Sequence, residues 1–315
     1  MAFTIFLFFI GFYILIKGAN FLVDGASSIA KFFNISSFVI GLVIVGIGTS
    51  IPEFAITLVD HITGAGDIGL GTIIGSNTFN ILFILGITAI FFTLPFKQEW
   101  VQRDLKWNMA AIAAAALFVF LFSKGEISRF EGSALIGLFL WWLFVVIKKT
   151  NHTVEDERPV KVVAFPLAFG LILAGIVGTI LGGEWVVDGA MVMAQAFGVG
   201  ESLIGLTIIG IGTSLPELAV TFTAAYRGRS GIAIGNIIGS NIFDFLMILG
   251  VASVIYPVSV SSGFTIDITM TILAAALLYG FMFIGKLYTL KRWQGFVFVF
   301  LYIIYILYLY ATIAA

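Results

Sequence analysis

The sequence contains no cysteine, and only 10% of its 315 residues are charged, against roughly 25% in a typical soluble domain. The absence of cysteine excludes disulfide bonds, thiolate metal sites and cysteine catalysis. The formal net charge of −1 gives no indication of a nucleic-acid partner. By contrast, 60% of the residues are hydrophobic, and apolar stretches long enough to cross a hydrocarbon core about 30 Å thick recur along the chain. The composition therefore predicts an integral membrane protein.

We predict an all-α protein with ten transmembrane helices. The first apolar stretch begins at the N-terminus without a small-residue cleavage site, so we expect no removable signal peptide. With the N-terminus outside, thirteen of the sixteen Lys and Arg residues fall on the cytoplasmic side. The positive-inside rule then predicts a multi-pass protein of the cell membrane with both termini outside. The predicted spans are 2–24, 37–60, 69–94, 106–123, 130–147, 162–186, 202–225, 231–256, 265–285 and 293–313.

The chain contains an internal repeat. A shift of 164 residues aligns 18–86 with 182–250 without a gap, and GLVIVGIGTS (41–50) matches GLTIIGIGTS (205–214) at eight of ten positions. Each half holds five predicted spans, so the second copy enters the membrane from the opposite side. We therefore expect two inverted-topology five-helix repeats, an architecture of many secondary transporters with a site at mid-membrane. The units are 1–147 with motifs in 41–80, a polar cytoplasmic linker at 148–161, and 162–315 with motifs in 205–244.

The most informative motif places proline beside glutamate in an apolar span. GIGTSIPEF contains Pro52 and Glu53, and GIGTSLPEL repeats them as Pro216 and Glu217. Proline lacks a backbone N–H and crowds the preceding turn, so we expect the first of these helices to open near Gly48 and Thr49. Freed carbonyl groups at membrane depth require a cavity, water or an ion. The motif therefore predicts two broken helices that line a polar cavity.

Other oxygen-bearing side chains accompany the two glutamates. Ser50 lies three residues before Glu53, on the same helical face, and the motifs GSNTFN and GSNIFD add further polar side chains at a spacing of four. Hard oxygen ligands without His or Cys suit Ca²⁺, Mg²⁺, Na⁺ or K⁺, and the flexible geometry of Ca²⁺ fits best. Asp244 corresponds to Asn80 and breaks the symmetry. The candidate ligands are Thr49, Ser50, Glu53, Ser76, Asn80, Thr213, Ser214, Glu217, Ser240 and Asp244.

Electrostatics favour exchange over one-way flow. A charge at the bilayer centre costs about 2.5–3.5 kcal/mol on insertion scales, so Glu53 and Glu217 require cations or protons. If the mobile element crosses only when this charge is neutralised, one divalent ion and two or more monovalent ions compete for the same pair of carboxylates. This hypothesis predicts antiport.

The two pairs of motifs, GTSIPEF with GSNTFN and GTSLPEL with GSNIFD, resemble the alpha-repeats of the calcium/cation antiporter superfamily. The resemblance covers nearly the whole chain and is strongest to prokaryotic sodium/calcium exchangers. It implies that Glu53 and Glu217 bind Ca²⁺ together with the carbonyl groups of Thr49 and Thr213. It further implies that the first and sixth spans slide across the other eight helices. The implied sodium ligands are the side chains of Ser50, Ser76, Asn80, Ser214 and Ser240 and the carbonyl groups of Gly46 and Gly210.

Two departures from the family pattern leave alternatives open. Gly46 and Gly210 stand where relatives can carry Ala. We expect glycine at these positions to keep carbonyl coordination but to loosen the local backbone. Asp244 resembles an acidic residue of potassium-dependent exchangers, so potassium transport stays open, and a proton-coupled calcium antiporter is a separate alternative. A cation channel could use the same ligands, and an enzyme is unsupported because no nucleophile, nucleotide motif or cofactor motif occurs. We expect no cofactor, with Na⁺, Ca²⁺ and the lipid bilayer as partners of a functional monomer.

Overall fold

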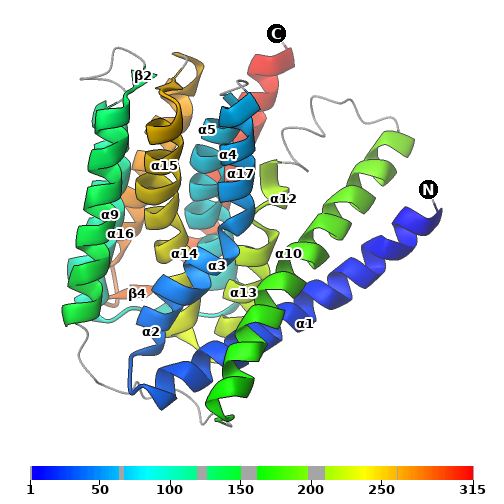
Figure 1. Ribbon diagram of the computed structural model, residues 1–315, viewed down its shortest axis with the longest axis vertical. Coiled ribbons are helices and arrows are strands. Elements are labelled where there is room, and N and C mark those ends of the chain that lie inside the picture. Colours follow the sequence, from blue (N-terminus) through cyan, green and yellow to red (C-terminus); the bar gives the residue numbers. More distant parts are fainter. Residues whose placement is uncertain are drawn as a thin grey trace.

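The computed structural model describes residues 2–63, 67–118, 126–149, 162–197, 210–260 and 262–314. Helices dominate these residues (Figure 1). The first half contains α1 (Ala2–Phe32), α2 (Ser37–Ile40), η1 (Gly41–Val45), α3 (Gly46–Thr49), α4 (Ile51–Thr63), α5 (Asp67–Phe79), η2 (Asn80–Leu85), α6 (Gly86–Phe91), β1 (Leu94–Pro95), α7 (Gln98–Trp100), η3 (Val101–Leu105), α8 (Lys106–Leu117), β2 (Glu126–Ile127) and α9 (Arg129–Lys149). The second half contains α10 (Phe165–Ala196), α12 (Gly210–Gly212), α13 (Leu215–Tyr226), α14 (Ser230–Ile242), η6 (Phe243–Ile248), α15 (Leu249–Ile255), β3 (Val258–Ser259), η7 (Ser262–Phe264), α16 (Thr265–Phe281), β4 (Thr289–Leu290) and α17 (Arg292–Ala314).

The prediction of a helical membrane protein is confirmed. Six helices of the described chain are long and apolar enough to cross a membrane, and a seventh span results if the bent pair 37–49 and 51–62 counts as one. The helix Thr265–Phe281 is apolar but shorter. The count of ten spans therefore stays a prediction. Residues 150–161 of the predicted linker and 202–209 of the predicted seventh span lie outside the described residues.

The helices α1 and α10 lie side by side and cross the remaining bundle obliquely (Figure 1). Glycines let their backbones approach closely, because a Cβ on Gly18 would lie 2.7 Å from the backbone nitrogen of Thr179. A Cβ on Gly175 would lie 2.6 Å from the backbone nitrogen of Leu22. Small residues of this kind allow tight helix packing in membranes, where no hydrophobic force drives helices together. The two helices therefore form a closely packed pair beside the bundle.

Two short sheets join the halves of the chain. The strand β1 pairs antiparallel with β4, with Leu94 opposite Leu290, and β2 pairs antiparallel with β3, with Ile127 opposite Val258. In the 164-residue alignment β1 corresponds to β3. Their pairing partners, β4 and β2, lie at opposite ends of the bundle (Figure 1). Strands that correspond in sequence therefore lie at opposite ends of the molecule.

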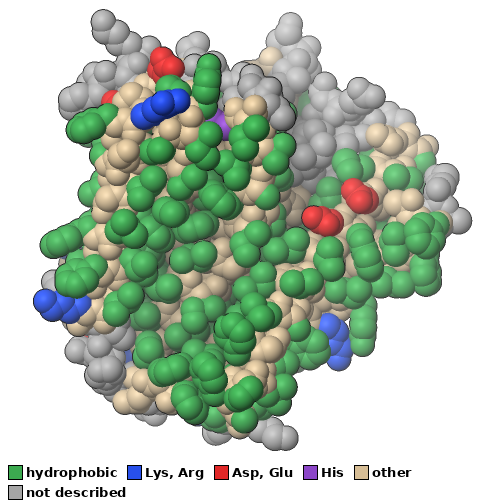
Figure 2. All heavy atoms as spheres, viewed as in Figure 1, with side chains coloured by type: hydrophobic (Ala, Val, Ile, Leu, Met, Phe, Trp, Pro, Cys, Tyr) green, Lys and Arg blue, Asp and Glu red, His purple; other side chains and the backbone are tan. Residues whose placement is uncertain are grey.

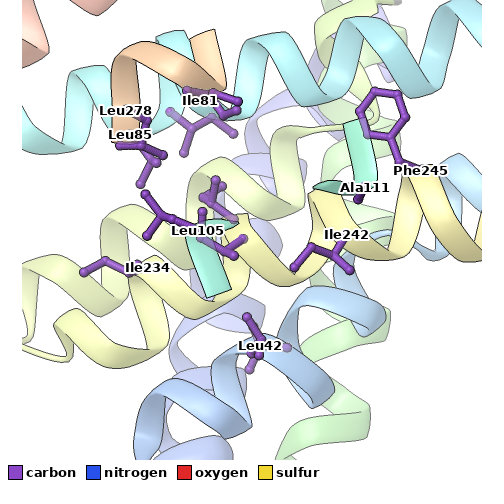
Figure 3. Packing of buried hydrophobic residues seen from close by; sticks show 14 of the residues in the cluster. Leu42, Ile81, Leu85, Leu105, Ala111, Ile234, Ile242, Phe245 and Leu278 are labelled. Carbon is purple, nitrogen blue, oxygen red and sulfur yellow. The ribbon is translucent and has the colours of Figure 1, made fainter. Parts of the chain in front are cut away.

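The apolar side chains fall into an interior and an outer set. Buried residues from both halves pack together, among them Leu42, Ile81, Leu105, Ile234 and Phe245 (Figure 3). The outer surface of the bundle is also largely hydrophobic, with few charges on the face in Figure 2. A soluble protein rarely exposes so large an apolar surface, whereas a lipid-facing surface requires it. The polar exceptions in the interior are therefore the informative residues.

Candidate functional site

The first proline–glutamate motif breaks its helix as predicted. The segments 37–49 and 51–62 meet at an angle of 42°, and Ser50 lies between them with φ −81° and ψ 8°. The discontinuity falls at Ser50, just after the predicted opening at Gly48 and Thr49. Pro52 has no N–H to donate to the carbonyl of Gly48, which loses its normal helical partner. The short helix α4 then begins, with Glu53 in its first turn.

The second motif has the same local form. Helix α12 ends at Gly212, and Ser214 precedes α13 with φ −90° and ψ 8°. Pro216 and Glu217 occupy the first turn of α13, as Pro52 and Glu53 do in α4. The backbone of Gly210 is described, whereas the preceding motif residues 205–209 lie outside the described residues. The duplicated sequence thus produces duplicated breaks.

The two glutamates of these breaks lie deep in the bundle. Glu53 and Glu217 are each 1% exposed, and so is Asp244 in η6. Glu53 lies within electrostatic range of both other carboxylates. Thr49 and Ser50 face the Glu217 carboxylate, and Thr213 faces Glu53. Side chains of each break therefore approach the acid of the other break, which brings the two motifs into one site.

Polar atoms without partners concentrate at this site. The described residues contain fifteen fully buried side-chain nitrogen or oxygen atoms without a hydrogen-bond partner, and ten of these belong to the paired motifs. Buried polar groups are normally satisfied, so such a concentration indicates a site for a ligand. Nine of the ten are oxygens, which suit a hard cation. The ten are Ser50 Oγ, Glu53 Oε2, Asn77 Oδ1, Asn80 Oδ1, Thr213 Oγ1, Ser214 Oγ, both Oε atoms of Glu217, Asn241 Nδ2 and Asp244 Oδ1.

Other predicted ligands make hydrogen bonds within the protein. Ser240 donates to the carbonyl oxygen of Gly46 at 3.1 Å, and Thr49 Oγ1 lies 3.2 Å from the same oxygen. The backbone N–H of Ser50 also reaches this oxygen, at 3.2 Å. Ser76, 1% exposed on α5, donates to the carbonyl of Ile73 at 3.1 Å. These residues lie around the site, but their oxygens have protein partners.

Gly46 has a packing role that differs from the predicted loosening of the backbone. A Cβ at this position would lie 2.8 Å from the backbone nitrogen of Ser240 and 2.9 Å from the carbonyl oxygen of Asn236. Glycine therefore lets α3 lie directly against α14. The close approach is what allows Ser240 to reach the Gly46 carbonyl.

Three buried amides of the site were not among the predicted ligands. Asn236 accepts from Thr49 at 3.1 Å and donates to the carbonyl of Glu217 at 3.3 Å, so it connects the two breaks. Asn77 contacts Asp244, the last residue of GSNIFD, and Asn241 contacts Asn80, the last residue of GSNTFN. Comparison of the halves could not reveal Asn236, because Thr72 stands at its counterpart. The repeated GSN triplet was a signal for Asn77 and Asn241, but their direction was not fixed by spacing.

Two cavities reach the edge of the site. One, of about 330 Å³, lies between α4, α10 and α13 and is lined by Pro52, Glu184, Asp188 and Thr213. The other, of about 300 Å³, lies between α5, α16 and α17 and also reaches Thr213. Because Thr213 faces Glu53, both cavities approach the carboxylates.

Asp24 and Asp188 correspond at the same 164-residue offset, each within a VDGA motif, but have different surroundings. Asp24 Oδ1 lies 2.6 Å from Nη1 of Arg227, which follows α13. Asp188 lines the 330 Å³ cavity with Glu184. Neither acid belongs to the group formed by Glu53, Glu217 and Asp244. No cluster of three or more His, Cys, Asp or Glu side chains in the described chain has metal-site geometry, so a cation there needs hydroxyl, amide or carbonyl oxygens as well.

Several relatives match this chain along nearly its whole length. The sodium/calcium exchanger MaX1 of Methanosarcina acetivorans is 30% identical over 344 residues, covering 96% of this chain and 97% of the relative. A Methanocaldococcus jannaschii protein named "uncharacterized membrane protein MJ0091" is 32% identical, covering 94% of this chain and 95% of its own.

Solved structures and a family model agree with these relatives. The sodium-calcium exchanger NCX_Mj, soaked with zero Na⁺ and Ca²⁺, matches with a TM-score of 0.83 at 32% identity, over 97% of this chain and 98% of that chain. The model of the sodium/calcium exchanger protein family matches residues 3–148 and 167–311. The matched ranges contain both broken helices and every predicted ligand. The chain therefore belongs to the sodium/calcium exchanger family.

Proposed function

We propose that this chain is a secondary antiporter that exchanges Na⁺ for Ca²⁺ across the membrane by alternating access. The observation that carries the proposal is the concentration of unpartnered buried oxygens between two broken helices that each present a glutamate. Membership of the sodium/calcium exchanger family supports the choice of ions. A transporter role also agrees with the two cavities that approach a buried site.

In the proposed site, Glu53 and Glu217 bind Ca²⁺ from opposite sides, together with the carbonyl groups of Thr49 and Thr213. This assignment is supported by the burial of both acids and by the unpartnered oxygens that they carry. Ca²⁺ takes six to eight oxygens with flexible geometry, which a mixed set of carboxylate and carbonyl oxygens can supply. Na⁺ ions take the flanking positions. Their proposed ligands are the side chains of Ser50, Ser76, Asn80, Ser214, Ser240 and Asp244 and the carbonyl groups of Gly46 and Gly210.

Exchange follows from the cost of an uncompensated charge. Two carboxylates buried close together repel each other and lose their hydration, so the ionised pair needs a bound cation. A Ca²⁺ ion and a set of Na⁺ ions both meet this need, but they compete for the same oxygens. If only the neutralised site can change its exposure from one side to the other, each ion crosses in place of the other.

We propose ten membrane spans arranged as two inverted five-helix repeats, with both termini outside and the linker at 148–161 in the cytoplasm. The opposite placement of the corresponding strands β1 and β3 supports the inversion. The bias of Lys and Arg towards one side supports the orientation. Each chain contains both halves of the proposed site, so we propose that the monomer transports.

The decisive experiment measures uptake of ⁴⁵Ca²⁺ into proteoliposomes under imposed gradients of Na⁺, K⁺ or H⁺. We expect uptake to follow the Na⁺ gradient and to fall at least about 100-fold in Glu53→Gln and in Glu217→Gln, because each removes half of the charge that the cation neutralises. Glu126→Gln, which makes the same change at an exposed strand residue, should transport normally.

Three results would contradict the proposal. Uptake driven by a proton gradient in medium free of sodium would indicate a proton-coupled antiporter. A strict need for potassium would assign Asp244 the role of a potassium ligand. Calcium flux without any counter-cation would indicate a channel.

A further inference from the structure

Two amide contacts cross between the halves of the molecule at the site. Asn77 Nδ2 on α5 donates to Asp244 Oδ2 on η6 at 2.9 Å, and Asn80 Nδ2 on η2 donates to Asn241 Oδ1 on α14 at 3.0 Å. In the 164-residue alignment Asn77 corresponds to Asn241, and Asn80 corresponds to Asp244. The same contact is therefore made twice, each time between the third residue of one GSN motif and the side chain three residues further along in the other motif.

The four side chains of these contacts are almost completely buried. Their exposure is 0% for Asn77 and Asn241 and 1% for Asn80 and Asp244. Asn77 also donates to the carbonyl of Ile73 at 2.7 Å, which anchors its amide on its own helix. An amide anchored in this way can hold the opposite side chain in one rotamer. The contact to Asp244 is the stronger of the two when the carboxylate is ionised, because hydrogen bonds to charged groups are stronger than neutral ones, whereas Asn80 and Asn241 are both neutral.

Each contact occupies one atom of the held side chain and leaves its other atom unpartnered among the described residues. For Asp244 this atom is Oδ1, and for Asn80 it is also Oδ1. Asp244 and Asn80 thus present one oxygen each, one from a carboxylate and one from an amide. Rotation of both Asn80 and Asn241 amides by 180° would keep their mutual bond but present a nitrogen instead. A cation selects the orientation that presents the oxygen.

We propose that Asn77 and Asn241 are positioning residues: each reaches across from one repeat and holds the ligand of the other, Asp244 or Asn80, with one oxygen free for the transported cation. The inference rests on the proposed function of the site and assigns the two asparagines no direct contact with the ion. It predicts a crosswise pattern. Asn77 acts through Asp244 in the other half and not through Asn80, its neighbour on the same helix.

Double-mutant cycles test this pattern, because residues that act through each other give non-additive effects. The measured quantities are the dissociation constant for Ca²⁺, obtained by calorimetry on purified protein, and the Na⁺ concentration that halves bound Ca²⁺. Both can be measured in variants that no longer transport. We expect Asn77→Ala to shift at least one of them about tenfold, in line with the loss of one hydrogen bond to a charged group. Added to Asp244→Ala it should change neither quantity by more than about twofold, whereas added to Asn80→Ala it should retain its full effect.

The reciprocal cycle uses Asn241. Its change to Ala should have no further effect beside Asn80→Ala and its full effect beside Asp244→Ala. A matched control is Asn108→Ala on α8, because Asn108 is also 1% exposed with an unpartnered amide oxygen among the described atoms. That variant should lower the thermal unfolding temperature without changing ion affinity. If Asn77→Ala does not fold, Asn77→Ser provides the same cycle.

Two outcomes overturn the inference. In the first, Asn77→Ala and Asp244→Ala change ion affinity independently, so that their effects multiply in the double variant. In the second, the double-mutant cycle couples Asn77 to Asn80 of the same half. Glu53→Gln in the same assay separates this failure from failure of the proposed function. If Glu53→Gln still binds Ca²⁺ normally, the site itself is wrong. If it abolishes binding while the crosswise pattern is absent, only the role of the two asparagines is wrong.

Discussion

The glycine face of α5 and the corresponding face of α14 share a sequence pattern but have different surroundings. A Cβ on Gly75 would have no neighbour within 4 Å among the described residues. A Cβ on its counterpart Gly239 would collide with the carbonyl oxygen of Leu42 in η1. The pair Gly71 and Gly235 differs in the same direction: Gly71 lines a cavity, while Gly235 lies against the α2–η1 segment.

Among the described residues, the two copies of one sequence therefore meet different neighbours, while residues 205–209, which correspond to η1, lie outside the described residues. The face of α14 is covered by the half-helix that precedes the first break, whereas the face of α5 lines the 300 Å³ cavity that reaches Thr213.

The largest effect on stability is expected from alanine at the packed glycine. Gly239→Ala should lower the free energy of unfolding by about 3 kcal/mol or more, because the added methyl group meets backbone that cannot rotate away. If the face of α5 is open, Gly75→Ala should raise it by about 0.5–1 kcal/mol, because alanine favours the helix over glycine. Thermal unfolding of the purified variants measures both.

Measurements of Ca²⁺ transport by the same two variants extend the comparison. If each half adopts the packing of the other during the cycle, Gly75→Ala should reduce the maximal rate of Ca²⁺ uptake although the protein is no less stable. Equal stability losses for Gly75→Ala and Gly239→Ala would show that the two faces are packed alike in solution, which would remove the basis of the comparison.

A smaller effect concerns the acids near the start of the fourth helix of each half. Asp104 precedes the predicted span 106–123 and is bonded to Arg103 at 3.0 Å. Burial raises the pKa of Asp104 from 3.8 to about 6, and Arg103 opposes part of this rise. Because the folded-state pKa exceeds the unfolded-state pKa, the resulting stabilisation is complete below about pH 4 and is lost as the pH rises through about 6. The loss should amount to about 2–3 kcal/mol.

Unfolding temperatures measured from pH 4 to 7.5 check this expectation. Asp104→Asn should remove the decline in stability over this interval. Asp267→Asn provides the control in the second half, since Asp267 binds the hydroxyl of Tyr305 and not an arginine, and the Asp104 transition should persist in that variant. An unchanged pH profile in Asp104→Asn would show that another group causes the decline.

The smallest effect is expected from the duplicated VDGA motifs. Asp24→Asn should cost at most about 1 kcal/mol, because its ion pair with Arg227 is partly exposed to solvent. Asp188→Asn should leave stability unchanged, since Asp188 has no basic partner within the described residues. Chemical denaturation at low and high salt measures the two values, and high salt should remove the difference. A larger loss for Asp188→Asn would contradict the assignment of the pairing to one half.

Much of the site could be predicted because its signals are local. A proline two residues after Ser50 must interrupt the helix, and Glu53 beside it cannot lie in lipid, so the break and its acid follow from adjacent residues. The duplication located the second break. Asn236 could not be found in this way, because its contacts are to Thr49 and Glu217, far away in sequence and specific to one half. The packing requirement at Gly46 could not be found in this way either, since it comes from the backbone of Ser240 and not from its own helix.

The sequence by itself determined a helical membrane protein with two broken helices, two buried acids and a repeat of 164 residues, because hydropathy, proline and duplication act within single segments. Only the tertiary structure decided which amide meets which side chain and that the glycine face of α14 lies against η1. Those choices depend on the distance between helices, and two copies of one sequence can meet different neighbours when the fold places them in different environments.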